Sequence, residues 1–342
     1  ETDPPAEFPW QPVLIGAAAV VLVLAAVACE HKERCYNHPH QPNVNIDVDW
    51  ATFDKETPSG MTMMIYDEEG ESEAHIRTND IAKVQTYLRE GVYNSVVFNQ
   101  SETEFANVSF HGLSNISTAQ VRAVRYVCDW YDTKSDTKAK VDSVAMEPEW
   151  IGSDKVSNYI VTKEMATTRG ILYDVADHYP ENITKTIFVR IAVEGIQNFY
   201  GARASLSGLA EGYMLGHQRP SEKEATYLLD FWITHPDPEN PDKGYIIAQV
   251  NNFGLPHGHK GRPQDNILEI NILLKDNKTQ LNYTFEVGHQ IEVADGWADP
   301  DVSLDLKIDK PFPDVEQSDQ LDGGFDATVD GWGDEEDHDI KM

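Results

Sequence analysis

Residues 281–287 read LNYTFEV, and residues 302–308 read VSLDLKI. In both stretches apolar and polar side chains alternate without a break, which is the pattern of a β-strand with one face in a core and one face in water. The two stretches therefore predict sheets in which each strand has one core side.

The same alternation extends over most of the chain from residue 43 onward. One short helix is expected at residues 80–90 (DIAKVQTYLRE), with Asp80 as its N-cap and Gly91 just past its end. Residues 121–131 also fit one face of a helix, but we favour a strand there. Short strands joined by loops with Gly, Pro, Asn and Asp predict an all-β protein built of β-sandwiches. Further strands are predicted at residues 44–50, 62–66, 92–98, 106–110, 187–193, 227–233, 245–250 and 267–274.

The length and the turn signals divide the chain into five parts. About 310 residues follow the apolar N-terminal stretch, which suggests two domains, and the turn-rich DHYPE at residues 177–181 marks a boundary near residue 180. The last segment holds eleven acidic residues and one lysine. The expected parts are a signal peptide at 1–28, a lipidated tether at 29–42, β-sandwiches at 43–180 and 181–313, and an acidic C-terminal tail at 314–342.

An uncharged apolar run occupies residues 13–28 and ends directly before Cys29. It is shorter than the roughly 20 residues of a membrane-spanning helix and close to the 7 to 15 of a signal-peptide core. Small residues before a cysteine resemble a bacterial lipobox, so we expect cleavage before Cys29 and a lipid on its sulfur. The alternative is a short uncleaved anchor, because residues 1–12 contain three acids and no lysine or arginine. Both alternatives place the rest of the chain outside the cytoplasm.

Charge and cysteines narrow the class of protein further. The chain has 58 acidic and 27 basic residues, a net charge of −31, which argues against electrostatic binding of nucleic acid or of an anionic membrane surface. Besides Cys29 there are two cysteines, Cys35 and Cys128. In an oxidising compartment these two either form one disulfide or remain two thiols, of which Cys128 is then expected to be buried.

No sequence motif for catalysis or for a cofactor is found. Nucleophile elbow, zinc-protease, P-loop and dinucleotide-binding motifs are all missing, so we expect neither enzymatic activity nor a cofactor. His257 and His259 are interpreted as a loop tip, and the acidic loop at residues 295–301 as a solvated loop, so no metal site is expected. Residues 142–144 (DSV) match a three-residue O-glycosylation pattern, which makes Ser143 a candidate for modification. Four tryptophans could stack on sugar rings, although Trp232 is expected in a core: Trp150, Trp232, Trp297 and Trp332.

Three separated segments resemble one protein family. They are residues 29–40 (CEHKERCYNHPH), residues 205–210 (SLSGLA), and an ending that combines GGF at 323–325, TVDGW at 328–332 and DIKM at 339–342. This order is similar to a Bacteroidales lipoprotein family of unknown function that is placed near the fimbrillin-like proteins.

The resemblance implies two tandem transthyretin-like Greek-key β-sandwiches on an outer-membrane lipid anchor at Cys29. It further implies a surface-exposed pilus accessory or anchor subunit, or an adhesin, that meets other pilus subunits by strand donation, in which main-chain hydrogen bonds complete the edge of a sheet. The alternative from another class is a glycan-binding surface lipoprotein that captures host or microbial glycans.

Overall fold

The computed structural model describes residues 41–126, 128–132, 144–167, 171–291, 301–318, 325 and 338–340. Strands make up most of this part, and the two α-helices in it are short: α2 (Asp129–Asp132) and α3 (Lys163–Thr167). Three 3₁₀ turns accompany them, η1 (Trp50–Thr52), η2 (Ile196–Asn198) and η3 (Gly288–Gln290). The predicted all-β fold is confirmed. Among the described residues no helix is long and apolar enough to cross a membrane.

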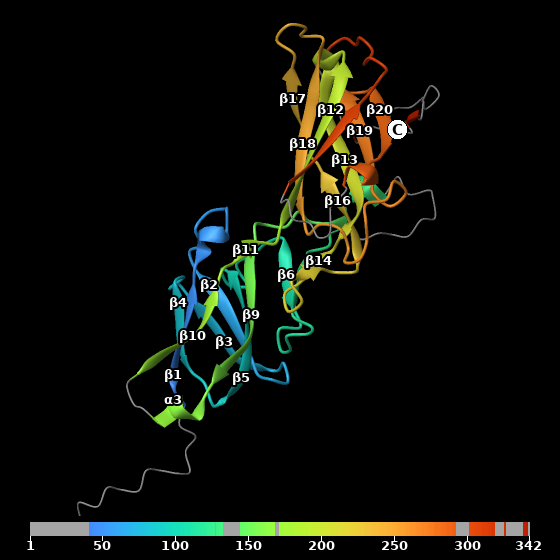
Figure 1. The fold of residues 1–342 in the computed structure, drawn as a ribbon. Helices are drawn as coiled ribbons and strands as arrows, with labels where there is room; N and C mark the ends of the chain where they lie inside the picture. The colour runs from blue at the N-terminus through green and yellow to red at the C-terminus, as the bar shows by residue number, and fades with distance from the viewer. Residues whose placement is uncertain are drawn as a thin grey trace, which may run out of the picture. The chain divides into compact units, whose positions relative to one another are not determined.

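Two sheets form the first sandwich (Figure 1). The three-stranded sheet has the order β10 (Leu172–His178), β1 (Asn43–Val48), β4 (Lys83–Tyr87). The five-stranded sheet has the order β11 (Glu181–Asn182), β9 (Gly152–Val161), β5 (Gly91–Asn99), β2 (Met61–Tyr66), β3 (Ser72–Thr78). Alternate residues of the facing strands meet in one apolar core, which includes Val44, Ile46, Val84, Met63, Ile65 and Val97.

The helix expected at residues 80–90 is wrong, because this segment forms β4. Val84 is buried opposite Ile46 of β1, and the antiparallel pairing with β1 continues from residue 83 to residue 87. Asp80 does act as a local cap, since its side chain accepts the amide proton of Ala82 at 3.2 Å, but it closes a turn that leads into a strand. Pairing along a sheet edge therefore outweighed the helix-like spacing of the apolar residues.

A smaller sheet, which we call the junction sheet, covers the second face of the five-stranded sheet. Its order is β15 (Arg219–Pro220), β14 (Gly212–Met214), β7 (Gln120–Ala123), β6 (Val108–His111). Phe110 of β6 stacks on Phe98 of β5 with ring centroids 4.4 Å apart. The strand expected at residues 121–131 is confirmed at its start as β7, whereas its end forms α2.

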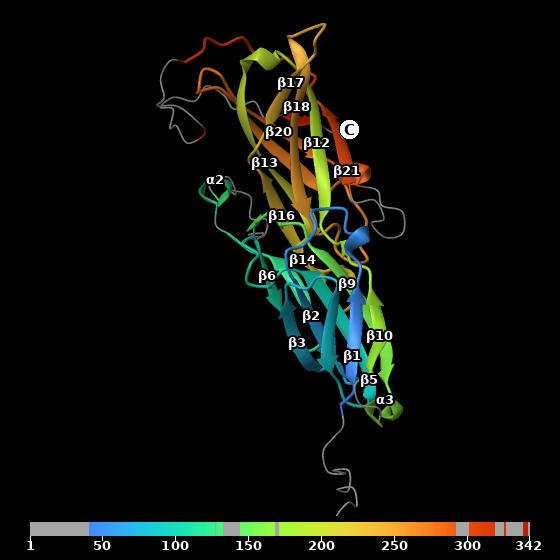
Figure 2. The same ribbon diagram turned by 90° about the vertical axis from the view of Figure 1, so that its left-hand side faces the viewer.

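The second sandwich contains the two stretches with the clearest alternation (Figure 2). One sheet has the order β17 (Ile233–Pro236), β18 (Lys243–Asn252), β12 (Lys185–Glu194), β21 (Asp301–Lys307). The other has the order β22 (His338–Ile340), β20 (Gln280–Glu286), β19 (Ile267–Leu274), β13 (Phe199–Ala210), β16 (Glu224–Leu229), β8 (Val144–Ala145). Tyr283 and Phe285 of β20 and Leu304 and Leu306 of β21 are buried in the core, as their alternation predicts.

Strands from before and after residue 180 share two of these sheets. In the junction sheet, β14 pairs antiparallel with β7 through Tyr213 and Val121. In the six-stranded sheet, β8 pairs in parallel with β16 through Ala145 and Tyr227. The hairpin of β14 and β15, which interrupts the run from β13 to β16, is thereby fixed against β6 and β7.

Candidate functional site

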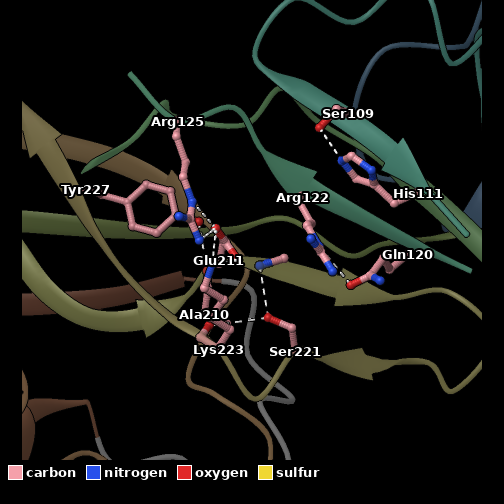
Figure 3. A network of polar contacts seen from close by, with 11 residues as sticks. Ser109, His111, Gln120, Arg122, Arg125, Ala210, Glu211, Ser221, Lys223 and Tyr227 are labelled. Atoms are coloured by element: carbon pink, nitrogen blue, oxygen red, sulfur yellow. Dashed lines mark hydrogen bonds and ion pairs between the residues drawn. The ribbon is translucent and has the colours of Figure 1, made fainter. Parts of the chain in front are cut away.

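A pocket of about 350 Å³ lies where β6 and β7 meet the hairpin that follows β13. Its walls come from β6, from β7 and the two residues after it, and from the two ends of the hairpin (Figure 3). The lining residues are mostly polar or charged: Ser109, His111, Arg122, Ala123, Val124, Arg125, Glu211 and Lys223.

Glu211 is the buried charge of this pocket, and two cations neutralise it. Its side chain is only 4% exposed and forms ion pairs with the guanidinium of Arg125 and with the ammonium of Lys223, the latter at 3.1 Å. The two cations are themselves half-exposed. A buried carboxylate requires such partners, because transfer of a lone charge out of water is costly. Glu211 therefore holds both cationic side chains at the pocket and supplies its one negative charge.

The local fold explains why Glu211 lies inside the protein. The segment at residues 205–210 forms a bulge in β13, where the pairing with β16 shifts between Leu206 and Leu209. Gly208 has φ +74°, and a Cβ there would lie 2.5 Å from the carbonyl oxygen of Asp265. The side-chain amide of Asn266 donates to the carbonyls of Ser207 and Gly208, at 3.2 and 3.0 Å. This clamp turns the chain, so that the next residues leave the six-stranded sheet and enter the hairpin.

Backbone hydrogen bonds then seat the hairpin against β7. The carbonyl of Glu211 accepts the amide proton of Ala123 at 2.9 Å, and the amide of Glu211 donates to the carbonyl of Lys223 at 2.8 Å. Gly212 permits this approach, since a Cβ at that position would lie 2.3 Å from the carbonyl oxygen of Val121. Tyr227 adds support from β16 by donating its hydroxyl proton to the carbonyl of Ala210 at 2.8 Å.

The opposite wall holds a third cation and an exposed Ser–His pair. The Arg122 Nε donates to the side chain of Gln120 at 3.0 Å, which fixes the orientation of the guanidinium. On β6, the Ser109 hydroxyl lies 2.9 Å from the His111 Nε2. Figure 3 shows these four side chains on β6 and β7, together with the ion pairs of Glu211. The pocket thus presents several hydrogen-bond donors, three of them cationic.

The loop LPHGHKGRP at residues 255–263 borders the same hairpin. The amide of His257 donates to the carbonyl of Ser221 at 3.2 Å, and the His259 Nδ1 lies 3.4 Å from the carboxylate of Glu224. Both histidines are exposed, in agreement with the expected loop tip. The loop therefore contacts the segment that carries Lys223 through its two histidines.

A second constellation lies inside the first sandwich and consists of Ser95, His178 and Asp154. The Ser95 Oγ is 2.8 Å from the His178 Nε2, and the His178 Nδ1 is 2.9 Å from the Asp154 Oδ2. This order of hydroxyl, imidazole and carboxylate is that of a nucleophile with its base and orienting acid. The hydroxyl and the imidazole are both 0% exposed, however, so no substrate reaches them. The three residues connect β10 of one sheet to β5 and β9 of the other.

The environment of Asp154 shows what this constellation does. Burial by itself raises the pKa of the carboxyl, but hydrogen bonds from His178 and from backbone amides, including that of Tyr179 at 3.1 Å, outweigh it and lower the pKa. The carboxylate is thus stabilised in its charged form by groups from two strands. We interpret the constellation as a brace between the two sheets.

The sequence-predicted modification residues are placed only in part. Cys29, Cys35 and Ser143 lie outside the described residues, so the lipid, disulfide and O-glycan assignments stay predictions. Cys128 is half-buried and directly precedes α2. Among the described residues, no group of three or more His, Cys, Asp or Glu side chains is placed to hold a metal ion.

The tryptophans considered for sugar stacking do not form a shared face in the described part. Trp232 is buried, as expected, and donates its indole proton to the carbonyl of Leu229 at 2.9 Å. Trp150 is half-buried, with the ammonium of Lys55 4.1 Å from its ring centroid. Trp297 and Trp332 lie outside the described residues, as does the acidic loop at 295–300.

The pocket was not predicted from the sequence, although a signal for it exists. Residues 105–128 contain no acidic residue, in a chain that averages one acid in about six residues. Arg122 and Arg125 stand in that segment, and Glu211 is the single charge in the otherwise uncharged run LAEGYML at residues 209–215. A single acid in an apolar segment requires a partner if it is buried. Such an acid therefore indicates a cation from elsewhere in the chain.

Comparisons with known proteins relate the chain to one family and to several solved structures. The model of a family described as a domain of unknown function, DUF5119, matches residues 28–230. No curated protein matches the chain.

Three solved structures illustrate the structural likeness. A candidate adhesin from Bacteroides ovatus has a TM-score of 0.56 at 14% identity, over 84% of this chain and 98% of that one. The fimbrial anchor protein Mfa2 from Porphyromonas gingivalis has a TM-score of 0.46 at 12% identity, over 78% of this chain and 90% of that one. A candidate polysaccharide-binding protein from Bacteroides thetaiotaomicron has a TM-score of 0.44 at 8% identity, over 78% of this chain and 90% of that one.

Proposed function

The chain belongs to the DUF5119 family, and from this premise we propose that it is a non-catalytic, surface-exposed protein of fimbrillin type, acting as a pilus accessory or anchor subunit or as an adhesin. The observation that carries the proposal is the fold, which a candidate adhesin matches with a TM-score of 0.56 over 84% of this chain and 98% of that one. The buried Ser95, in the one described arrangement that resembles a catalytic triad, supports the non-catalytic part.

We further propose that the protein is a lipoprotein of the outer membrane, anchored through Cys29. The family match begins at residue 28, directly before this cysteine, and includes only the last residue of the apolar run. A single acyl chain binds membranes only marginally, whereas more than one chain anchors a protein stably. Cys35 with Cys128, and Ser143, remain candidates for a disulfide and an O-glycan, which mass spectrometry of the mature protein tests.

Assembly by strand donation is the proposed contact with other pilus subunits. β17 is an edge strand whose four residues are all exposed, and Ile233 within it is 51% exposed. Phe231, just before this strand, is 80% exposed. An open edge with apolar side chains is the surface that another strand extends, while charged residues protect edges from such pairing.

Fractionation of producing cells tests the location and the anchor. We expect the wild-type protein in the outer-membrane pellet, labelled by a palmitate analogue and digested by protease added to intact cells. Cys29→Ala should move it to the soluble fraction, whereas Cys35→Ala should leave it in the pellet. A Cys29→Ala variant that stays in the pellet would refute the lipid anchor.

Purified fimbriae test the partner. The protein should copurify with them and form high-mass assemblies, and Ile233→Lys should reduce these assemblies, while Thr226→Ser in the interior of the six-stranded sheet should not. Absence of the wild-type protein from fimbriae, with full surface exposure, would reject the pilus role and leave the adhesin role.

A further inference from the structure

We propose that the junction-sheet pocket binds an anionic sugar, that is, a glycan unit that carries a carboxylate or a sulfate group. The inference rests on the proposed function as a surface adhesin and gives it a ligand class. Arg122, Arg125 and Lys223 would meet the negative group, and the hydroxyl of Ser109 and the ring of His111 would meet sugar hydroxyls.

Acidic residues are unevenly distributed along the chain. A chain of net charge −31 repels anions over most of its surface, yet three segments almost free of acids converge here. Residues 105–128 and 243–264 contain no Asp or Glu, and residues 195–221 contain only Glu211. The pairing of β7 with β14 joins the first segment to the third, and the hydrogen bond from His257 to Ser221 joins the second to the third. Folding thus brings three acid-poor segments together at the hairpin, where Glu222 and Glu224 flank Lys223.

The positive charges of the pocket are only partly neutralised within the protein. Arg125 and Lys223 are engaged by the buried Glu211, and the charge of that carboxylate is fully matched. Among the described residues the Nη atoms of Arg122 have no hydrogen-bond or ion-pair partner, while its Nε is held by Gln120. A planar guanidinium held in this way offers two parallel N–H groups to an oxyanion. The three cations and the one carboxylate leave a net charge of +2 at the pocket, and the Nη groups of Arg122 are available to a ligand.

The pocket is small, and most of its lining residues are polar or charged. Apolar side chains contribute only Ala123 and Val124, so an apolar peptide side chain would gain little buried surface. A volume of about 350 Å³ lies at the small end of ligand pockets, which suits one or two sugar units. Ser109, His111 and Lys223 offer hydrogen bonds that a polyhydroxylated ligand uses and a simple inorganic anion leaves unmade.

Calorimetric titration of the full chain in detergent tests the proposal. The probes are methyl glucuronide, glucose 6-sulfate, methyl glucoside, acetate and an acidic tetrapeptide. We expect binding of at least one of the two anionic sugars, with affinity that falls as salt is raised, and no binding of the neutral glucoside. Arg122→Gln should weaken that binding about tenfold, because a charge-assisted hydrogen bond is lost.

Arg190→Gln is the matched control, since Arg190 is an exposed arginine that pairs with Asp305 on the outer face of the second sandwich. Equal binding of the glucoside, tighter binding of acetate or of the tetrapeptide, or equal losses in the two arginine variants would each overturn the proposal. So would the failure of both anionic sugars to bind. None of these results bears on the fractionation and fimbria experiments, so a failed ligand and a failed surface role are distinguishable.

Discussion

The protein contains two Ser–His pairs of nearly equal geometry in very different surroundings. In the first sandwich, Ser95 and His178 are 2.8 Å apart, and both are 0% exposed. At the pocket, Ser109 and His111 are 2.9 Å apart, and the histidine is exposed. Hydrogen-bond length alone would assign both pairs the same role. Access to solvent decides which of them can meet a ligand.

The acidic residue of each region reinforces the contrast. Asp154 binds the fully buried His178 and closes a brace between two sheets, and its own side chain is 26% exposed. The acid of the pocket, Glu211, also binds inward, but its partners Arg125 and Lys223 are half-exposed. A brace stabilises the fold, whereas a pocket retains donors for a ligand. Three changes test this difference, beginning with the largest expected effect.

His178→Ala should lower the free energy of unfolding by about 3 kcal/mol, because it leaves a cavity in the core and removes the hydrogen bonds of His178 to the buried Ser95 hydroxyl and to Asp154. His111→Ala should change it by less than about 0.5 kcal/mol, as is usual for an exposed position. Urea denaturation followed by circular dichroism measures both variants.

Chemical modification supplies an independent check of the same contrast. Diethylpyrocarbonate should modify His111 in the folded protein and His178 only after unfolding. Equal stability losses in the two alanine variants, or rapid modification of His178, would show that the brace is open to solvent.

Glu211→Ala should cost about 2 kcal/mol. Removal of one partner from a buried ion pair costs roughly 3 to 5 kcal/mol, and the half-exposed cations here regain water and reduce that cost. Glu211→Gln should cost less, since an amide oxygen still accepts a hydrogen bond. Thermal unfolding of the two variants is the measurement.

Glu222→Ala is the matched control, because the Glu222 side chain is 75% exposed in the same hairpin. Its midpoint should match that of the wild type. A Glu211→Ala variant as stable as Glu222→Ala would mean that Glu211 does not hold the pocket together.

The strands with a clear apolar pattern were predictable, and several strands without one were missed. β20 and β21 each bury one face, so their sequences record their environment directly. β3 reads SEAHIRT, lies at a sheet edge and buries none of its residues fully, which leaves no apolar period to detect. β13 reads FYGARASLSGLA, and its small residues concealed a twelve-residue strand. The helix prediction for residues 80–90 was wrong for the opposite reason. A helical spacing of apolar residues was present, but pairing with β1 decided the structure.

The pocket could not be derived from the sequence, because its walls are distant along the chain. Arg122 and Glu211 are brought together only by the pairing of β7 with β14, and no local pattern specifies that pairing. What the sequence does record is the shortage of acids in the segments that converge there. In a strongly acidic chain, such a shortage is a better pointer to a binding region than any single basic residue.

The smallest predicted effect separates the brace from the surface by its dependence on pH. The pKa of Asp154 is lowered in the folded protein, so its contribution to stability is present above the unfolded value of about 3.9 and is lost as the pH falls through the folded value. Asp154→Asn should therefore cost about 1 kcal/mol at pH 7, from the weakened hydrogen bonds, and progressively less below about pH 4. The neighbouring exposed Asp177→Asn should cost little at either pH. Urea titrations of the three proteins at pH 7, 5 and 3 measure this, and a gap between wild type and Asp154→Asn that widens toward pH 3 would contradict the brace.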